Sequence, residues 1–403
     1  MIRTGLLGIV ACMFLQSAAL AQMRAPHVSE AACEEPTLRC ATKATPAFGP
    51  DGTLWLVWMA GGQVLVASSQ DAGRSFSSPT QVTTTRLNLD WGPDARPKIV
   101  VDRKGGIALA FSTFRDEAFN GQVLYTRSID GGKSFAELKP ITANNESQRF
   151  EALALDQEGT VFAAWLDKRN RILAKEAGQK YEGAGLFFTS SGDGGTTYAE
   201  AKLAREGTCE CCRLGLALAA PGRPVVIFRN IFEGGVRDHA VMTFTDVATP
   251  GEVRRISVDD WQINACPHHG PSLTIAPNGT YHVAWYTNGK ARKGLFYAHS
   301  RDEGRTFSAP MVLGQPGRNP TRPFVLAGPA GTVMVWKEFD GEKTSVQMTV
   351  SHDDGETWSP PRTIASTSDT SDHPLLASEG KQTYLSWMTK VDGYRLTAIE
   401  DRP

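Results

Sequence analysis

Cysteine and histidine residues gather in two short segments of this chain. The first reads Cys209-Glu-Cys211-Cys212-Arg213 and the second reads Cys266-Pro-His268-His269. In an exported chain, disulfides are the default, with Cys266 joined to one cysteine of the triplet and the other two joined together. Soft thiolates mixed with imidazole also suit copper(I) or zinc(II), and a strained Cys211–Cys212 link would be readily reduced. The candidate metal ligands are Cys209, Cys211, Cys212, Cys266, His268 and His269.

Arginine and histidine residues recur at one position of a repeat, just before a β-rich run. The candidate ligand-binding residues are these and two loop arginines: Arg96, Arg149, Arg213, Arg229, Arg237, His269, Arg322 and His373. Guanidinium groups bind carboxylates or phosphates bidentately, so their convergence would make an anion site. The alternative is that each arginine pairs with a nearby carboxylate and joins adjacent units, with candidates at Asp90, Asp94, Glu146 and Glu151.

The repeat that would bring these residues together is a β-rich run that ends in an aromatic residue. It occurs seven times, beginning at Thr53, Ile107, Val161, Val225, Tyr281, Val333 and Tyr384. The interval is roughly 50 to 60 residues, close to that of kelch-like repeats. Short strands with turns between them at one period predict four-stranded blades arranged radially. In such a ring the first strand of each blade lines the channel, so the residues before it meet at one mouth.

A second motif marks five of the units: a serine, an aspartate, a glycine, a hydroxyl residue and an aromatic residue at fixed spacing. The copies lie at 69–76, 128–135, 191–198, 300–307 and 351–358. The aspartate accepts hydrogen bonds from backbone amides and the glycine takes a positive φ, as a hairpin turn requires. This motif resembles the Asp box of the sialidase (neuraminidase) superfamily and related β-propellers.

The resemblance implies a propeller and, as one alternative, an exo-acting sialidase-like glycoside hydrolase. Sialidases use an arginine cluster for the substrate carboxylate, a Tyr–Glu nucleophile pair and an aspartic acid as general acid. Arg96, Arg213 and Arg322 are candidates for the cluster, and Tyr181 and Tyr286 are the nearest tyrosines by loop placement. The chain departs from the family in lacking an Arg-Ile-Pro motif. We therefore expect an all-β fold, a seven-bladed β-propeller of four-stranded antiparallel blades, with a six-bladed sialidase-type propeller as the alternative.

Other features of the sequence indicate where the protein is located and which partners it can bind. Residues 1–21 are typical of a cleaved secretory signal, which leaves 22–403 as one propeller domain in a periplasmic or secreted protein. A lipoprotein anchor at Cys12 is the alternative, and Cys33 with Cys40 is the expected local disulfide. The net charge of −1 provides no field that would attract nucleic acid or an anionic membrane. The last unit is short of one strand, which the segment before Pro46 would need to supply.

These features favour one function over two others. We expect an exported propeller that binds an anionic ligand at an Arg/His-lined channel mouth, beside a Cys/His cluster for copper or zinc. The ligand would be an anionic small molecule, a carboxylate-bearing glycan or a protein partner. A glycoside hydrolase and a scaffold for protein partners are the alternatives, and a closed ring is expected to be monomeric.

Overall fold

A computed structural model of the chain describes residues 37–400. The expected signal peptide, Cys12 and Cys33 lie outside these residues, so the signal and the Cys33–Cys40 disulfide stay predictions. Within residues 37–400, no helix is long and apolar enough to cross a membrane.

About half of the chain is antiparallel strand and only 5% is helix, which confirms the all-β prediction. The first two sheets contain β1 (Lys43–Phe48), β2 (Leu54–Ala60), β3 (Gln63–Ser69) and β4 (Thr80–Gln81), then β5 (Lys98–Val101), β6 (Ile107–Phe114), β7 (Gly121–Ser128) and β8 (Lys139–Pro140). The next strands along the chain are β9 (Gln148–Leu155), β10 (Val161–Asp167), β11 (Ala184–Ser191), β12 (Lys202–Thr208), β13 (Gly215–Ala220), β14 (Arg223–Phe232), β15 (Val236–Thr243) and β16 (Val253–Arg255). These eight form one sheet because Thr208 of β12 pairs with Asn230 of β14.

Three further sheets complete the described fold. They contain β17 (Ser272–Ile275), β18 (Tyr281–Asn288), β19 (Lys293–Ser300) and β20 (Met311–Leu313); β21 (Thr321–Gly328), β22 (Gly331–Phe339), β23 (Thr344–Ser351) and β24 (Arg362–Thr367); and β25 (Leu375–Glu379), β26 (Gln382–Thr389) and β27 (Gly393–Ala398). One α-helix, α1 (Arg169–Glu176), and the 3-10 turns η2 (Leu38–Cys40), η3 (Glu233–Gly235) and η4 (Pro316–Arg318) lie in the connections.

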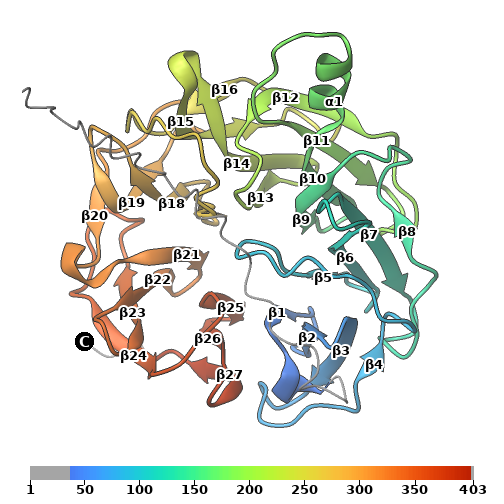
Figure 1. Ribbon diagram of the computed structural model, residues 1–403. Helices are drawn as coiled ribbons and strands as arrows, with labels where there is room; N and C mark the ends of the chain where they lie inside the picture. The colour runs from blue at the N-terminus through green and yellow to red at the C-terminus, as the bar shows by residue number, and fades with distance from the viewer. Residues whose placement is uncertain (1–36, 401–403) are drawn as a thin grey trace, which may run out of the picture.

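The sheets follow one another around a ring, and the last sheet lies beside the first (Figure 1). Their first strands form a continuous series of contacts, in which β1 touches β5, β5 touches β9, β9 touches β13, β13 touches β17, β17 touches β21 and β21 touches β25. Strand β25 in turn touches β1. The residues that begin these strands therefore meet near the axis of the ring, as the repeat predicted.

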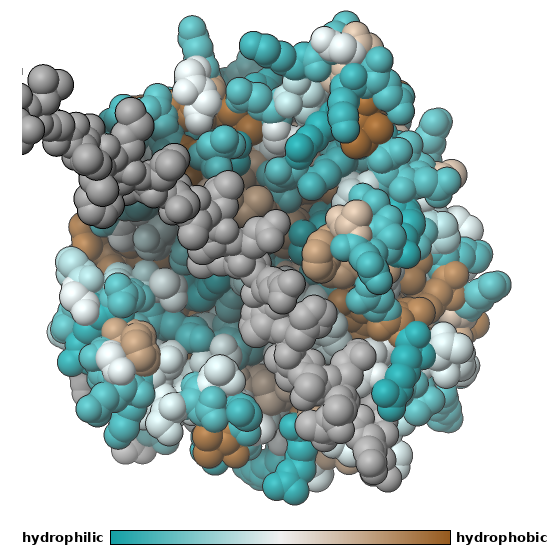
Figure 2. All heavy atoms as spheres, viewed as in Figure 1, coloured by the Kyte–Doolittle hydropathy of each residue, from teal (hydrophilic) through white to brown (hydrophobic). Residues whose placement is uncertain are grey.

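Apolar side chains fill the spaces between neighbouring sheets. Trp165 of β10 packs with Val123 and Tyr125 of β7, and Trp336 of β22 packs with Tyr297 of β19. Such large buried rings contribute much of the apolar burial that stabilises a sheet-on-sheet contact. The face of the molecule that Figure 2 shows is mostly hydrophilic outside the grey atoms, with hydrophobic residues scattered among the polar ones.

The five repeated turns have the expected hydrogen bonds. In the first, the amide of Ser75 donates to Oδ1 of Asp71 at 2.8 Å, and the Ser75 hydroxyl donates to Oδ2 at 2.6 Å. Gly73 has φ +84° and donates its amide to the Ser69 hydroxyl at 2.8 Å. These bonds turn the chain back toward the core after the third strand of the sheet.

The last sheet differs from what was expected. Among residues 37–400 it has three strands, and the segment before Pro46 does not supply a fourth. Residues 43–45 instead pair with β2 as the start of β1, while η2 packs against β27. The prediction of a fourth strand is therefore wrong for the described part of that segment, because β2 takes up its backbone groups.

Candidate functional site

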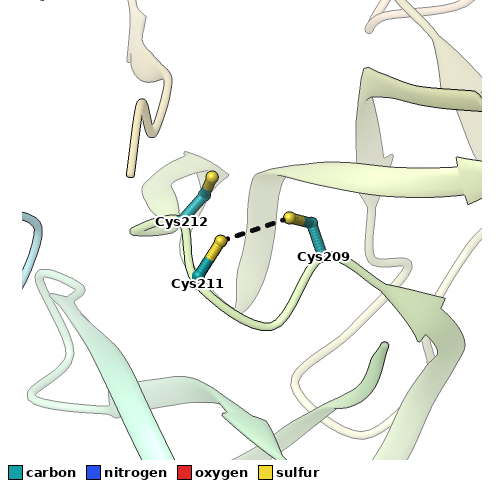
Figure 3. A group of neighbouring side chains, drawn as sticks. All are labelled: Cys209, Cys211 and Cys212. Carbon is teal, nitrogen blue, oxygen red and sulfur yellow. Dashed lines mark hydrogen bonds between the residues drawn. The ribbon is translucent and has the colours of Figure 1, made fainter. Parts of the chain in front are cut away.

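Three buried thiols lie on the loop between β12 and β13. Cys209, Cys211 and Cys212 are 1%, 2% and 1% exposed, and their sulfur atoms lie within 4.8 Å of one another. The Sγ atoms of Cys209 and Cys211 are 3.6 Å apart and face each other, with Cys212 beside them on the same loop (Figure 3). All three are free thiols, as is the exposed Cys266. The expected disulfides among these four cysteines are absent from the described structure.

The second segment, between β16 and β17, lies against the first. The thiols of Cys266 and Cys211 shift each other's pKa, but Cys266 lies outside the group of three sulfur atoms that are within 4.8 Å of one another. The ring of His269 stacks on Tyr286 with centroids 4.1 Å apart. The Nδ1 atoms of His268 and His269 are buried and have no hydrogen-bond partner in the described structure. The structure thus brings the six predicted metal ligands into one neighbourhood, with three thiols at its centre.

The surroundings of the thiols shift the pKa values of Cys209 and Cys211 in opposite directions. Hydrogen bonds from Cys211 and Cys212 hold the pKa of Cys209 well below its usual value, with support from the charges of Arg229 and Arg237. The same bonds raise the pKa of Cys211. The guanidinium Nη1 of Arg237 lies 3.7 Å from the Cys209 sulfur. The site therefore stabilises a negative charge on sulfur, which is the form that binds metals.

Helix α1 fixes the loop from outside. Glu210, between the first two cysteines, pairs with Lys168 Nζ at 3.0 Å and with Arg171 Nη1 at 2.5 Å. Because Lys168 and Arg171 lie at the beginning of one helix, the Glu210 side chain is held outward from the loop. Its neighbours Cys209 and Cys211 are buried on the other side.

Asp94 connects the two cysteine segments to the channel. Its carboxylate accepts from Arg213 Nη1 at 2.9 Å, from Arg322 Nη1 at 2.8 Å and from the amide of Gly270 at 2.9 Å. A Cβ on Gly270 would lie 2.1 Å from Cγ of Arg213, so the two loops are in direct contact. The carboxylate is fully buried, and it joins three segments that are far apart in sequence.

A second buried carboxylate, Asp372, holds other cations of the mouth. Arg96 Nη2 lies 2.8 Å and Lys43 Nζ 3.2 Å from its Oδ1, and Lys337 donates to its main-chain oxygen at 3.4 Å. Burial alone would raise the pKa of Asp372, but Arg96 and Lys43 lower it below the ordinary value. Sequence reasoning placed Lys43 at the mouth but missed Asp372 and Lys337, although Asp372 directly precedes the predicted His373.

Four of the predicted arginines, Arg96, Arg149, Arg213 and Arg322, pair with buried carboxylates, as the alternative prediction stated, whereas Arg229 and Arg237 do not. Arg149 binds Asp90 through Nε at 2.6 Å and Nη2 at 2.8 Å. Arg229 donates to the main-chain oxygens of His269 at 3.0 Å and Tyr286 at 3.1 Å, and stacks on Trp261. These contacts hold both arginines in fixed positions within the ring.

The two predicted histidines add no positive charge to the mouth. Burial lowers the pKa of His269 to about 3, and burial with nearby Arg322 and Arg213 lowers that of His373 well below its usual value. Both are therefore neutral at pH 7. The positive charges of Arg322, Arg213 and Arg96 all contribute to the lowered pKa of His373. These three arginines therefore lie near His373.

Three of the nine non-glycine residues with positive φ in the described structure lie at the beginnings of inner strands. Phe150, His268 and Arg322 have φ values of +60°, +50° and +57° at the beginnings of three different sheets. Non-glycine residues avoid this region, and strain of this kind clusters at functional sites. The strain at His268 and Arg322 lies on the two segments that Asp94 connects.

Tyr181 and Tyr286, the tyrosines that the sequence placed nearest to a sialidase nucleophile, lie in different surroundings from each other. Tyr181 donates its hydroxyl to Glu206 beside a surface pocket of about 560 Å³. Burial and this hydrogen bond raise the pKa of Tyr181, which is opposite to what a phenolate nucleophile requires. Tyr286 packs against His269 and Trp261.

Comparison with known proteins identifies the fold. No family model and no curated protein matches the sequence. Among solved structures, a PL25 ulvan lyase is 12% identical over 90% of this chain and 95% of its own, with a TM-score of 0.56. An α-L-arabinanase from Penicillium chrysogenum is 14% identical over 91% and 95%, with a TM-score of 0.53. A protein of unknown function from Dyadobacter fermentans DSM 18053 is 17% identical over 75% and 92%, with a TM-score of 0.52. These likenesses show that the chain has a β-propeller fold.

Proposed function

We propose that this protein is an exported β-propeller that binds a copper(I) ion through the thiols of Cys209, Cys211 and Cys212. The observation that carries the proposal is the set of three buried, free thiols whose sulfur atoms all lie within 4.8 Å of one another. A metal–sulfur bond is about 2.3 Å long, so an ion between these atoms could reach all three with small movements.

The choice of copper(I) rests on the donor set. Thiolates are soft ligands that select copper(I) and zinc among common ions. Structural zinc almost always has four ligands, whereas only three thiols of this group are buried. The exposed Cys266 stands apart from them.

Charge also supports a thiolate site. Three thiolates around a monovalent ion carry two net negative charges, which must be compensated where water is excluded. Arg237 lies 3.7 Å from Cys209, and Arg229 acts on the same thiol from its buried position. Metal ligation would also keep the thiols from pairing as disulfides in an oxidising compartment.

Anaerobic titration of the reduced protein with copper(I) against a chromogenic chelator tests the proposal. We expect one ion per chain in the wild type and its loss in Cys209→Ser, Cys211→Ser and Cys212→Ser. Cys266→Ser is the matched control and should still bind one ion. If the control loses the ion, or if the native protein contains one zinc ion instead of copper, the proposed three-thiol copper site is wrong.

Peptide mapping without reduction tests the main alternative. If the protein purified from the periplasm contains two disulfides among Cys209, Cys211, Cys212 and Cys266, the cluster is structural and the metal proposal is wrong. Free or metal-protected thiols in the same sample are the expected result.

We also propose that the propeller has seven blades, six with four strands and the last with three among the described residues. The series of contacts through seven first strands, which returns from β25 to β1, supports this count. In this count the eight-stranded sheet is two blades, β9–β12 and β13–β16, which are joined by the pairing of β12 with β14. An experimental structure with six blades would contradict it.

Binding of an anionic ligand at the channel mouth is a second candidate function. One observation favours it: five cationic side chains contact just two aspartates, Asp94 and Asp372, of the described mouth. The cations are Lys43, Arg96, Arg213, Arg322 and Lys337. Calorimetric titration with glucuronate or sialate should show binding that weakens in Lys337→Ala. Turnover of a fluorogenic sialoside that is lost in Arg322→Ala would favour the glycosidase alternative instead.

A further inference from the structure

We propose that Cys266 is the exchange ligand through which copper(I) reaches and leaves the buried thiols. The inference rests on the proposed copper site. It names the partner class as a carrier that presents copper(I) on thiolate or thioether sulfur.

The contrast in exposure is the first observation. Cys209, Cys211 and Cys212 are at most 2% exposed, whereas Cys266 is exposed, in a stretch where Asn264 and Ala265 are exposed as well. A carrier's ligands therefore cannot touch an ion held by the buried three, but they can approach Cys266.

Continuity of sulfur contacts is the second observation. The loop of Cys266 lies against the loop of the buried thiols, since a Cβ on Gly270 would lie 2.1 Å from Cγ of Arg213, and the thiols of Cys266 and Cys211 influence each other. Cys211 in turn lies 3.6 Å from Cys209. A path of sulfur atoms thus leads from solvent to the centre of the cluster. Cys266 comes from the loop between β16 and β17, separate from the loop of the other three, so it can move without displacing them.

Ligand exchange on such a path requires no change of oxidation state. A bond from copper(I) to the Cys266 sulfur forms as a bond to the carrier's sulfur breaks, and the Cys266 proton passes to water. Bonds to the buried thiols then form in turn, each thiol that is still protonated giving its proton to water as its bond to copper forms. Cys266 and the carrier's released thiolate each take up a proton when their own bonds to copper break. Copper stays monovalent throughout, and the number of copper–sulfur bonds stays nearly constant, which avoids release of a bare ion into water.

Glu210 keeps the loop that carries Cys209, Cys211 and Cys212 in place during such exchange. Its pairs with Lys168 and Arg171 tie the three-thiol loop to α1, whereas the segment around Cys266 has no comparable ion pair among the described residues. The three-thiol loop therefore stays fixed during the exchange.

Stopped-flow measurement of copper uptake from a copper(I)–glutathione complex tests the inference. Because exchange depends on the accessible sulfur, we expect Cys266→Ser to slow uptake about tenfold or more while equilibrium affinity changes little. Cys266→Met, which restores a sulfur donor, should recover part of the rate. Ala265→Ser, a change at the exposed neighbouring position, is the matched control and should take up copper at the wild-type rate.

The outcomes separate this inference from the proposed function. An unchanged uptake rate in Cys266→Ser overturns the inference alone. Loss of affinity together with rate makes Cys266 a permanent fourth ligand and also overturns it. A wild-type protein that takes up no copper overturns the proposed function and the inference with it.

Discussion

Replacement of Asp94 by asparagine tests how far the channel mouth depends on one buried carboxylate. The substitution preserves the shape of the side chain but removes its charge. Arg213 and Arg322, whose side chains are 12% and 16% exposed, would then face each other without an anion between them. The amide of Gly270 would retain an acceptor only if the asparagine oxygen faces it.

The expected magnitude follows from burial. Removal of one partner of a buried ion pair typically lowers the free energy of unfolding by about 3–5 kcal/mol. Unfolding entropy is roughly 2 cal/mol/K per residue, so a chain of this length should lose about 4–6 °C in melting temperature.

Thermal and urea unfolding followed by circular dichroism would measure the change. Glu303→Gln is the matched control, because its pair with Arg223 lies at the surface, with side chains 47% and 35% exposed. Such exposed pairs contribute at most about 1 kcal/mol. If Asp94→Asn lowers stability no more than the control does, the arginines find other partners and the mouth does not depend on this carboxylate.

Three further predictions concern the loops, the thiols and the turns. Gly270→Ala should lower stability by about 1–3 kcal/mol and weaken copper binding, because its Cβ would overlap Arg213; urea unfolding and chelator competition measure both. Arg237→Gln should weaken copper affinity about tenfold, since it removes the charge beside Cys209; the same competition assay measures this. Hydrogen bonds, first from the hydroxyl four residues on, lower the pKa of Asp71 from 3.8 to about 2. Its contribution to stability is therefore complete above pH 4 and lost as the pH falls toward 2, which unfolding midpoints across that range would show.

Matched variants distinguish these effects from general damage. Gly317→Ala introduces a Cβ with no atom within 4 Å and should leave the unfolding midpoint unchanged. Arg254→Gln removes an exposed arginine and should leave copper affinity unchanged. A midpoint that stays constant down to pH 2 would contradict the prediction for the turns.

The sequence predicted the strands, the place where the site would form and two of its carboxylates, Asp90 and Asp94, but not which arginine each carboxylate binds. The period of the β-rich runs places Arg96, Arg213 and Arg322 at equivalent positions, and any closed ring brings such positions together. Their partners Asp94 and Asp372 come from other units, and nothing in local spacing shows which carboxylate an arginine will reach.

The sequence also could not predict whether the cysteines form disulfides or remain free thiols. Spacing shows that Cys209, Cys211 and Cys212 are close, yet disulfide bonds and metal ligation use the same residues. The structure has three of these thiols buried and Cys266 exposed, and burial depends on how the β12–β13 loop packs against α1 and the adjacent blade.

The junction of β1 with the last sheet has a mechanical consequence. No backbone ladder crosses it in the described structure; side chains hold it, with the Lys43–Asp372 pair on the channel side and Trp58 packed with Met388 farther out. Tension applied between the two ends of the domain would load this contact directly, so the circle should open there before any single sheet unravels.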